Sequence, residues 1–181
     1  RAWFVNKNRV YRMGLENTGG TTKIFAEFRT GSGDYEDLQG TTLSNASGGW
    51  YHVVFTFDDS SNRIRLYVNG NLVASKTHNS STINNNSPFS IGRRHDTNAG
   101  YYAGKIDEVA YWNTELSANA ITALYNSGTP LSASSNSGNY TSSGNLVAYY
   151  QFQQNLNDSE GSFTLTGINI GSSDYSAETI E

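Results

Sequence analysis

The sequence predicts an all-β protein, an antiparallel β-sandwich with one short helix near residues 117–126. Short runs of alternating apolar and polar residues recur along its 181 residues, separated by turns rich in Gly, Ser and Asn. Twelve Tyr, eight Phe and three Trp accompany a single Met, and aromatic side chains pack well on a pleated sheet. The dipeptide Asn69-Gly70 lies between two such runs and predicts a tight hairpin, because both residues of a type I′ turn need a positive φ.

The expected strands are short and follow one another closely. The run 50–57 is mostly apolar on both faces, as in a strand at the middle of a sandwich. In the run 63–68, charged or aromatic residues alternate with aliphatic ones. Trp50 and Trp112 are expected in the core. We expect strands over residues 10–16, 23–29, 50–57, 63–68, 72–75, 89–92, 102–112, 146–152 and 163–170, and a short strand within 31–49.

One helix is expected, over about residues 117–126. Ser117 is a suitable N-cap, because its hydroxyl can accept a hydrogen bond from a free N–H of the first turn. Gly128 stands where a left-handed residue commonly ends a helix. An apolar stripe with i, i+3, i+4 spacing is expected to face the sandwich and consists of Ile121, Leu124 and Tyr125.

The length suits a single domain over residues 1–181, because a chain of this size can bury a core without disulfides or metals. We expect a main body over residues 1–128, a polar loop over 129–144, and C-terminal strands within 145–181. The chain begins at Arg1 without a charged and apolar signal segment. We therefore expect it to be a segment of a longer protein.

Composition argues against several classes of function. The formal net charge is -4 with no long basic run, which argues against a nucleic-acid partner. No apolar stretch approaches the roughly 20 residues that span a bilayer, so membrane insertion is not expected. The absence of Cys excludes disulfides, thiol catalysis and thiolate zinc sites. It also favours a bacterial or viral source, since many secreted eukaryotic modules of this size carry a disulfide.

The stretch from residue 49 to 128 carries an ordered set of motifs. The set comprises W-x-H (Trp50, His52), LYVNGNLV (66–73), SIG (90–92), GKIDEVAYW (104–112) and a helix ending in LYNSG. In this order the motifs resemble the laminin-G-like, concanavalin-A-like jelly rolls, a superfamily that also includes the pentraxins. The resemblance implies a jelly-roll sandwich and covers less than half of the chain.

The two ends of the chain depart from the layout of that family. A typical member has one or two strands before the position where this chain starts, and these are missing here. The segment LVAYYQFQQNLNDSEG (146–161) is similar to the opening strand of such a domain. It can close this domain after the helix, begin the next copy of a tandem array, or replace the missing first strand as in a permuted domain. We favour its packing on this domain.

Asp107 and Glu108 are adjacent acids at the start of an expected strand. Adjacent residues on a strand point to opposite faces, whereas related sandwich glycosidases carry their acids at alternate positions, as E-x-D-x-E. A glycosidase also needs a second carboxylate about 5–10 Å away across the sugar. We therefore expect a structural or hydrogen-bonding role for this pair, no catalytic residues, and a protein that is not an enzyme.

The loop after residue 92 holds the candidate ligand-binding residues. Two arginines suit carboxylates or sulfates, since a guanidinium can bind them with two hydrogen bonds. A tyrosine ring could stack on a sugar. The candidates in this loop are Arg93, Arg94, Asp96, Asn98, Tyr101 and Tyr102.

The same loop is where pentraxin-like relatives hold calcium. By that resemblance Asp96 matches an acidic ligand, and Asn98 could add an amide oxygen. Arg94 falls where an acid would be expected, and a cation there opposes calcium. A two-calcium cluster is therefore not expected, while a single weak calcium ion at Asp96 and Asn98 stays open, and no cofactor is firmly predicted.

Three functions follow from these observations. The first is a non-catalytic carbohydrate-binding or cell-surface-binding module of a larger extracellular or virion-surface protein, whose partner is a glycan or polysaccharide. The second is a structural module of a phage fibre, capsid decoration or adhesin, whose partners are neighbouring copies or domains of the parent protein. The third and most remote is a polysaccharide-active enzyme, for which the acids are lacking.

Overall fold

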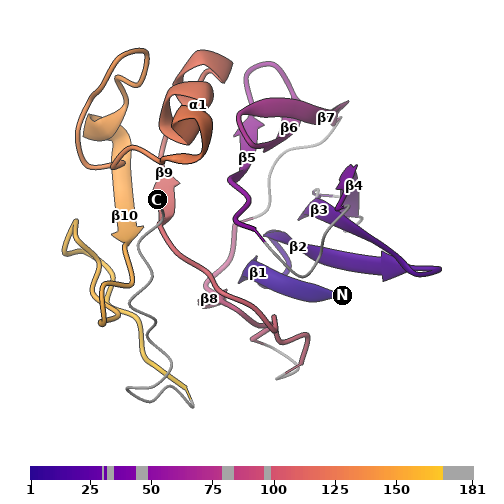
Figure 1. Ribbon diagram of the computed structural model, residues 1–181. Coiled ribbons are helices and arrows are strands. Elements are labelled where there is room, and N and C mark those ends of the chain that lie inside the picture. Colours follow the sequence, from indigo (N-terminus) through magenta and orange to yellow (C-terminus); the bar gives the residue numbers. More distant parts are fainter. Residues whose placement is uncertain (30, 32–34, 44–48, 79–83, 96–98, 169–181) are drawn as a thin grey trace. The chain divides into compact units, whose positions relative to one another are not determined.

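The structure is a computed structural model that describes residues 1–29, 31, 35–43, 49–78, 84–95 and 99–168. By their internal contacts the residues form two compact units, Arg1–Gly104 and Lys105–Glu181. Figure 1 traces the elements of each unit along the chain. The expectation of a single domain over residues 1–181 stays a prediction.

The first unit contains two antiparallel sheets (Figure 1). The larger sheet has the strand order β4-β3-β2-β1-β8 and the smaller one the order β5-β6-β7. The strands of the larger sheet are β1 (Ala2–Lys7), β2 (Tyr11–Thr18), β3 (Thr21–Arg29), β4 (Tyr35–Thr42) and β8 (Phe89–Ile91). The strands of the smaller sheet are β5 (Val53–Asp58), β6 (Arg63–Val68) and β7 (Asn71–Thr77).

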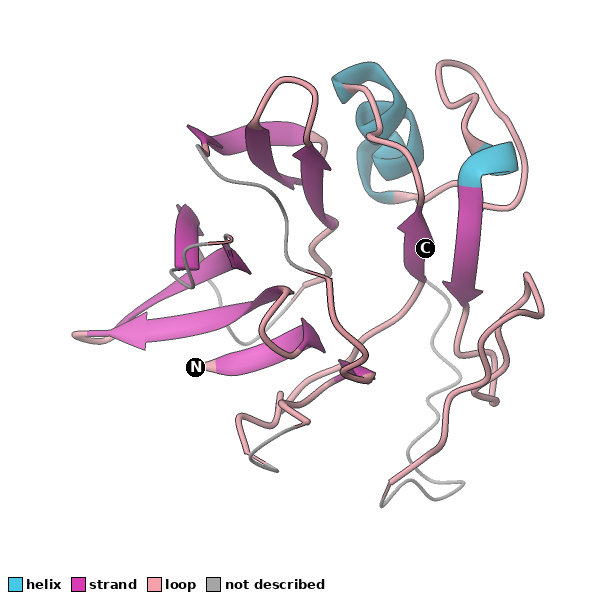
Figure 2. Cartoon of the chain, turned by 180° about the vertical axis from the view of Figure 1, so that it is seen from behind, coloured by secondary structure: helices cyan, strands magenta, loops and turns pink. Residues whose placement is uncertain are grey.

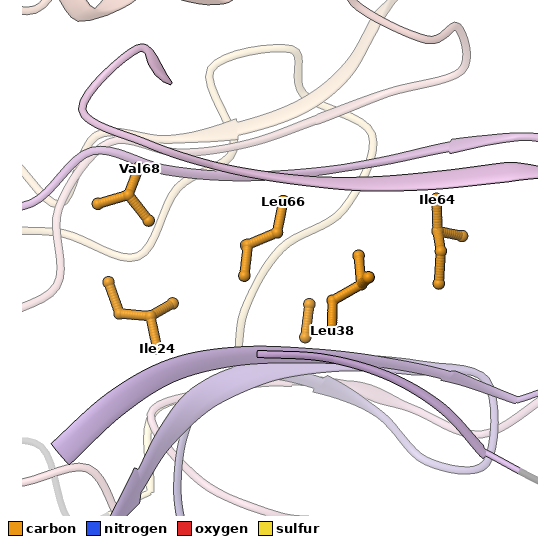
Figure 3. Close-up of a cluster of buried hydrophobic side chains, with 6 residues drawn as sticks. Ile24, Leu38, Ile64, Leu66 and Val68 are labelled. Atoms are coloured by element: carbon orange, nitrogen blue, oxygen red, sulfur yellow. The ribbon is translucent and has the colours of Figure 1, made fainter. Parts of the chain in front are cut away.

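The two sheets of this unit form a sandwich around one hydrophobic core. Figure 3 shows side chains of β6 pointing at side chains of β3 and β4. Both layers contribute fully buried aliphatic residues, and such burial stabilises by about 25 cal/mol per Å² of apolar surface removed from water. The buried cluster consists of Ile24, Ala26, Leu38, Ile64, Leu66 and Val68.

Two tight hairpins set the strand registers of this unit. Asn69 and Gly70 have φ angles of 49° and 74°, which confirms the hairpin predicted from this dipeptide. Gly19 and Gly20, at φ 61° and 80°, connect β2 to β3. From this turn the two strands pair over eight consecutive positions without a bulge.

The second unit contains the short helix and a two-stranded antiparallel sheet. Its elements are β9 (Val109–Trp112), α1 (Ala118–Tyr125), the 3₁₀ turns η1 (Asn126–Gly128) and η2 (Ser143–Asn145), and β10 (Leu146–Tyr150). Figure 2 shows α1, and the short turn before β10, as helical parts of this unit. Among the residues that the structure describes, no helix has both the length and the apolar character to cross a bilayer.

The ends of α1 follow the predicted capping, with one shift. The Ser117 hydroxyl accepts a hydrogen bond from the Ala120 N–H at 3.1 Å, as an N-cap should. The first left-handed residue at the other end is Asn126, at φ 43°, so the helix ends before Gly128. Asn tolerates the left-handed region better than most residues, which explains why Gly128 is not needed for this cap.

Asp158 organises the turn that follows β10. Its carboxylate is buried and accepts four backbone hydrogen bonds, from the N–H groups of Tyr149, Glu160, Ser162 and Phe163. Hydrogen bonds to a charged acceptor are each worth about 1.5–3 kcal/mol. Asp158, in the segment LVAYYQFQQNLNDSEG, is therefore the acceptor around which this turn folds.

The all-β antiparallel class with a short helix is confirmed, but two strand predictions were wrong. Residues 102–108 are not a strand, and only Val109–Trp112 pairs. Glu108 has φ 53°, a left-handed conformation that a continuous strand cannot contain. Residues 163–168 form no strand, and residues 169–170 lie outside the described ranges.

Two features near the starts of strands also differ from the expectation. β1 was not expected, yet it pairs with both β2 and β8, so the chain supplies a strand ahead of residue 10. A bulge between Trp3 and Val5 interrupts the alternation of buried and exposed residues in β1. The sequence pattern therefore did not predict this strand. β5 begins at Val53 rather than at residue 50, and Trp50 is 40% exposed instead of lying in the core.

Gly14 is required by the close approach of β1 to β2. A Cβ atom at this position would overlap the carbonyl oxygen of Ala2, which is backbone and cannot rotate away. We predict that Gly14→Ala lowers the free energy of unfolding by about 2 kcal/mol, in the range of overpacking substitutions. Gly144→Ala is the matched control, since nothing lies within 4 Å of its Cβ position. Equal denaturant midpoints for the two variants would contradict the prediction.

Candidate functional site

The loop that follows β8 carries the predicted site, and its backbone is tied to β1. The Gly92 N–H donates to the Phe4 carbonyl at 2.8 Å, and the Trp3 N–H donates to the Gly100 carbonyl at 3.1 Å. The Tyr102 N–H donates to the Gly92 carbonyl at 2.9 Å and joins the two arms. Both arms of the loop are therefore fixed to the five-stranded sheet.

Two further contacts hold the backbone of the arginine pair. The Ser90 hydroxyl lies 3.2 Å from the Asn6 carbonyl and 2.9 Å from the Arg93 carbonyl. The Arg94 N–H donates to the Ala99 carbonyl at 3.0 Å, as part of an isolated antiparallel bridge. Arg93 and Arg94 are thus held at defined backbone positions, and both side chains are half-buried.

Gly100 allows the returning arm to lie against the Trp3 indole. It has φ 64°, and a Cβ atom there would overlap the indole ring. Only glycine satisfies both conditions at low cost. The contact places the end of the loop directly beside an aromatic side chain of β1.

The two predicted tyrosines have different environments. Tyr101 is 54% exposed, so about half of its surface is accessible to a ligand. The ring of Tyr102 packs edge-on against Phe4 with centroids 4.9 Å apart, and burial raises the pKa of its hydroxyl. Of the two rings, Tyr101 therefore offers the better platform for stacking.

Asp96 and Asn98, the two predicted calcium ligands, lie outside the described residues. The described part of the loop contributes Arg93, Arg94 and His95 and no carboxylate, a set that does not fit a hard cation. Within the described ranges, no group of three or more His, Asp or Glu residues could hold a metal ion. The calcium site stays a prediction.

A polar row crosses the five-stranded sheet beside this loop and was not predicted from the sequence. Its members are cross-strand partners in the order Ser90, Asn6, Arg12, Glu27 and Asp37, one from each strand. Their neighbour Ala26 belongs to the core cluster. Since successive residues of a strand point to opposite faces, the row lies on the face away from the core.

Arg12 and Glu27 form a buried ion pair at the centre of that row. The Arg12 Nε donates to Glu27 Oε2 at 2.5 Å. The guanidinium lies over the Trp3 ring at 4.7 Å and the Tyr35 ring at 4.1 Å. Contact with aromatic rings favours a guanidinium over an ammonium, because the planar guanidinium can stack on them. Arg1 forms a second ion pair with Glu27. The buried carboxylate therefore has two cationic partners.

The adjacent acids of the second unit, Asp107 and Glu108, take part in two hydrogen bonds. Asp107 Oδ1 accepts the Glu108 N–H at 3.0 Å, and Glu108 Oε2 accepts the hydroxyl hydrogen of Tyr149. A hydrogen-bonding role for the pair is thus confirmed. Burial first, and the Asp107 charge second, raise the pKa of Glu108 to about 7.

The first unit is thus a two-layer antiparallel β-sandwich with an anchored loop beside β8, which defines an all-β class of protein. The chain belongs to the concanavalin A-like lectin/glucanases superfamily, whose sequence model matches residues 1–122. A search of curated protein sequences found no match.

A solved structure shares the fold. It is the crystal structure of a "putative carbohydrate binding protein" from Bacteroides ovatus, with a TM-score of 0.65 and 21% sequence identity. The match covers 88% of this chain and 45% of that one. The chain therefore spans less than half the length of the protein that it resembles.

The buried ion pair gives a test by double substitution. We predict that Arg12→Met and Glu27→Leu each lower the free energy of unfolding by about 3 kcal/mol, because each leaves a buried charge with one partner fewer. The double variant should lose clearly less than the sum of the two. Arg63→Met is the control, since Arg63 is exposed on β6. Additive losses in chemical denaturation would contradict a direct coupling.

Glu108 should make the second unit less stable as the pH rises. Its pKa is about 7 in the folded chain against an ordinary value of 4.5, so the folded state binds more protons between these values. The contribution of Glu108 to stability is then fully present below pH 4.5 and is lost as the pH rises through about 7. Glu108→Gln should flatten this decline in thermal unfolding followed over pH, while Glu160→Gln, at an exposed acid, should leave it unchanged.

Proposed function

We propose that this chain is a non-catalytic carbohydrate-binding module. The observation that carries the proposal is Tyr101, a 54% exposed ring at the end of a loop tied to β1 by backbone hydrogen bonds. A rigid aromatic ring can bind the C–H face of a sugar with little loss of conformational entropy. The superfamily and the carbohydrate-binding description of the similar Bacteroides protein support the same function.

The arginine pair favours an acidic glycan at this loop. Arg93 and Arg94 precede the tyrosine, and their backbones are held by Ser90 and Ala99. A guanidinium can bind a carboxylate or sulfate through two hydrogen bonds. Uronic acids or sulfated sugars therefore suit the loop better than neutral ones.

Three acids of the described residues are unsuited to glycosidase chemistry. Such an enzyme needs two carboxyl groups about 5–10 Å apart on either side of the bond that is cut. Asp107 Oδ1 accepts the backbone N–H of the adjacent Glu108, and the Glu108 carboxylate accepts the Tyr149 hydroxyl. Glu27 is buried and paired with Arg12. These arrangements support binding without catalysis.

The setting that we propose is a larger extracellular, cell-surface or virion-surface protein. The length of the similar protein, about twice the span of the match, supports a parent with further parts. We also propose that residues 145–181 complete the same domain. Limited proteolysis in the loop 131–144 that released a C-terminal fragment without loss of folding would contradict that organisation.

An assembly module without glycan affinity is the second candidate. The observation that favours it is β4, an eight-residue strand at the edge of the five-stranded sheet. Edge strands carry backbone groups that can pair with another chain. Neighbouring copies or domains of a fibre, capsid decoration or adhesin would be the partners.

A glycan array probed with the full chain tests the proposed function. We predict binding to acidic glycans that Tyr101→Ala weakens by about tenfold, the upper range for losing one stacked ring. Tyr111→Ala is the matched control, because Tyr111 is similarly exposed, on β9 of the other unit.

Other outcomes would support the alternatives. Binding to no glycan, together with concentration-dependent assembly in light scattering, would favour the assembly module. Release of sugar from a polysaccharide, abolished by Glu108→Gln, would establish catalysis instead.

A further inference from the structure

A pocket lies in the first unit, and none of its lining residues belongs to the predicted loop. It opens between the end of β4, the residue Tyr51 before β5, and the β6–β7 hairpin, and has a volume of about 290 Å³. This is just below the range of drug-sized ligand clefts, roughly 300–1,000 Å³, so the pocket has room for one small ligand. Its lining consists of Thr41, Thr42, Leu43, Tyr51, Val68, Asn69, Asn71 and Val73.

The floor of this hairpin pocket is apolar and continuous with the core. Val68 is a member of the buried core cluster, and Leu43, Tyr51 and Val73 pack against that cluster. The floor therefore moves only if the sandwich itself deforms. A ligand would meet a preformed surface that includes one tyrosine ring.

Two of the polar side chains of the hairpin pocket are held by hydrogen bonds. Asn69 exchanges two hydrogen bonds with His52, since its side-chain oxygen accepts the His52 N–H at 2.9 Å and its N–H donates to the His52 carbonyl at 2.8 Å. The Asn71 amide nitrogen donates to the Asn69 carbonyl at 2.9 Å, which leaves the Asn71 oxygen as an acceptor. The hydroxyls of Thr41 and Thr42 add groups that both donate and accept.

None of the eight lining residues is charged. A charged ligand would have to leave water without an opposite charge to receive it, which is costly. A neutral ligand with many hydroxyl groups and one apolar face is complementary to this lining, which combines apolar and uncharged polar side chains. A neutral hexopyranose has this chemistry, with its C–H face for Tyr51 and its hydroxyls for the Thr and Asn groups.

We propose that the hairpin pocket binds one neutral sugar unit, as a second subsite separate from Tyr101 and the arginine pair. This assignment rests on the proposed glycan-binding function and adds a ligand class to it. The loop would take acidic groups of a glycan, and the hairpin pocket would take a neutral residue.

The test is an NMR titration of the full, isotope-labelled chain with methyl glycosides of glucose, galactose and mannose. Methyl glucuronide serves as the charged counterpart. We expect one or more neutral glycosides to shift the amides of Thr42, Tyr51 and Asn71, and the glucuronide to leave them unchanged. Sugar-to-ring NOEs to Tyr51 in the unsubstituted chain would locate the sugar without any variant.

Two substitutions at exposed positions probe the polar groups. Thr42→Val and Asn71→Ala should each weaken the neutral glycoside by about threefold to tenfold, the effect of losing one hydrogen bond. Thr77→Val, on the same β7 strand as Asn71, and Asn119→Ala, on α1, are the matched controls, since both residues are exposed outside the pocket. Native-like amide spectra would show that the variants fold.

The outcomes separate this assignment from the proposed function. If neutral glycosides leave the pocket amides unshifted, or if Thr42→Val and Asn71→Ala bind as tightly as the controls, the hairpin subsite is wrong. Loss of array binding in Tyr101→Ala would still support the proposed function in that case. Pocket shifts that persist in Tyr101→Ala support the subsite, and they do so even if that variant keeps its array binding and the loop assignment fails.

Discussion

The register of β2 against β3 determines what each face of the five-stranded sheet carries. Gly19 and Gly20 make a two-residue turn, and the two strands then pair without a break. This register directs Ile24 and Ala26 into the core and places Glu27 beside Arg12 on the other face. A slip by one residue would exchange the two faces, because side chains alternate along a strand. The Gly19-Gly20 turn therefore determines both which side chains of β2 and β3 face the core and which belong to the polar row.

The polar row and the loop meet at β1. Trp3 covers the Arg12 guanidinium, donates its backbone N–H to Gly100, and accommodates that glycine against its indole. Any change that moved Trp3 would disturb both the buried ion pair and the anchored arm that ends in Tyr101. The exposed binding groups thus depend on residues that no ligand touches. The hairpin pocket has a different support, since its floor is the sandwich core itself.

Local signals predicted most strands, while features that depend on distant contacts were missed. The residue types of Asn69-Gly70 favour a positive φ by themselves, and the Ser117 hydroxyl can cap a helix without help from distant residues. Glu108 gives no such signal, because its left-handed φ is imposed by its surroundings. The Arg12–Glu27 pair could have been found, as both residues are equally distant from the Gly19-Gly20 turn. The rings of Trp3 and Tyr35 that lie against the Arg12 guanidinium come from β1 and the start of β4, and the sequence pattern cannot predict those contacts.

The pairing of β1 with β8 has a consequence for how the chain reaches this state. β1 precedes its second partner, β8, in the chain by six other strands and their loops. Until Phe89–Ile91 is synthesised, one edge of β1 has no backbone partner from that strand. Non-local pairing of this kind slows folding and leaves partly built sheets prone to misassociation. The described arms of the loop that carries Tyr101 are bonded to β1 and to each other, so their anchored form depends on this pairing, and the binding loop would report on the folding of this sheet as well as on ligand.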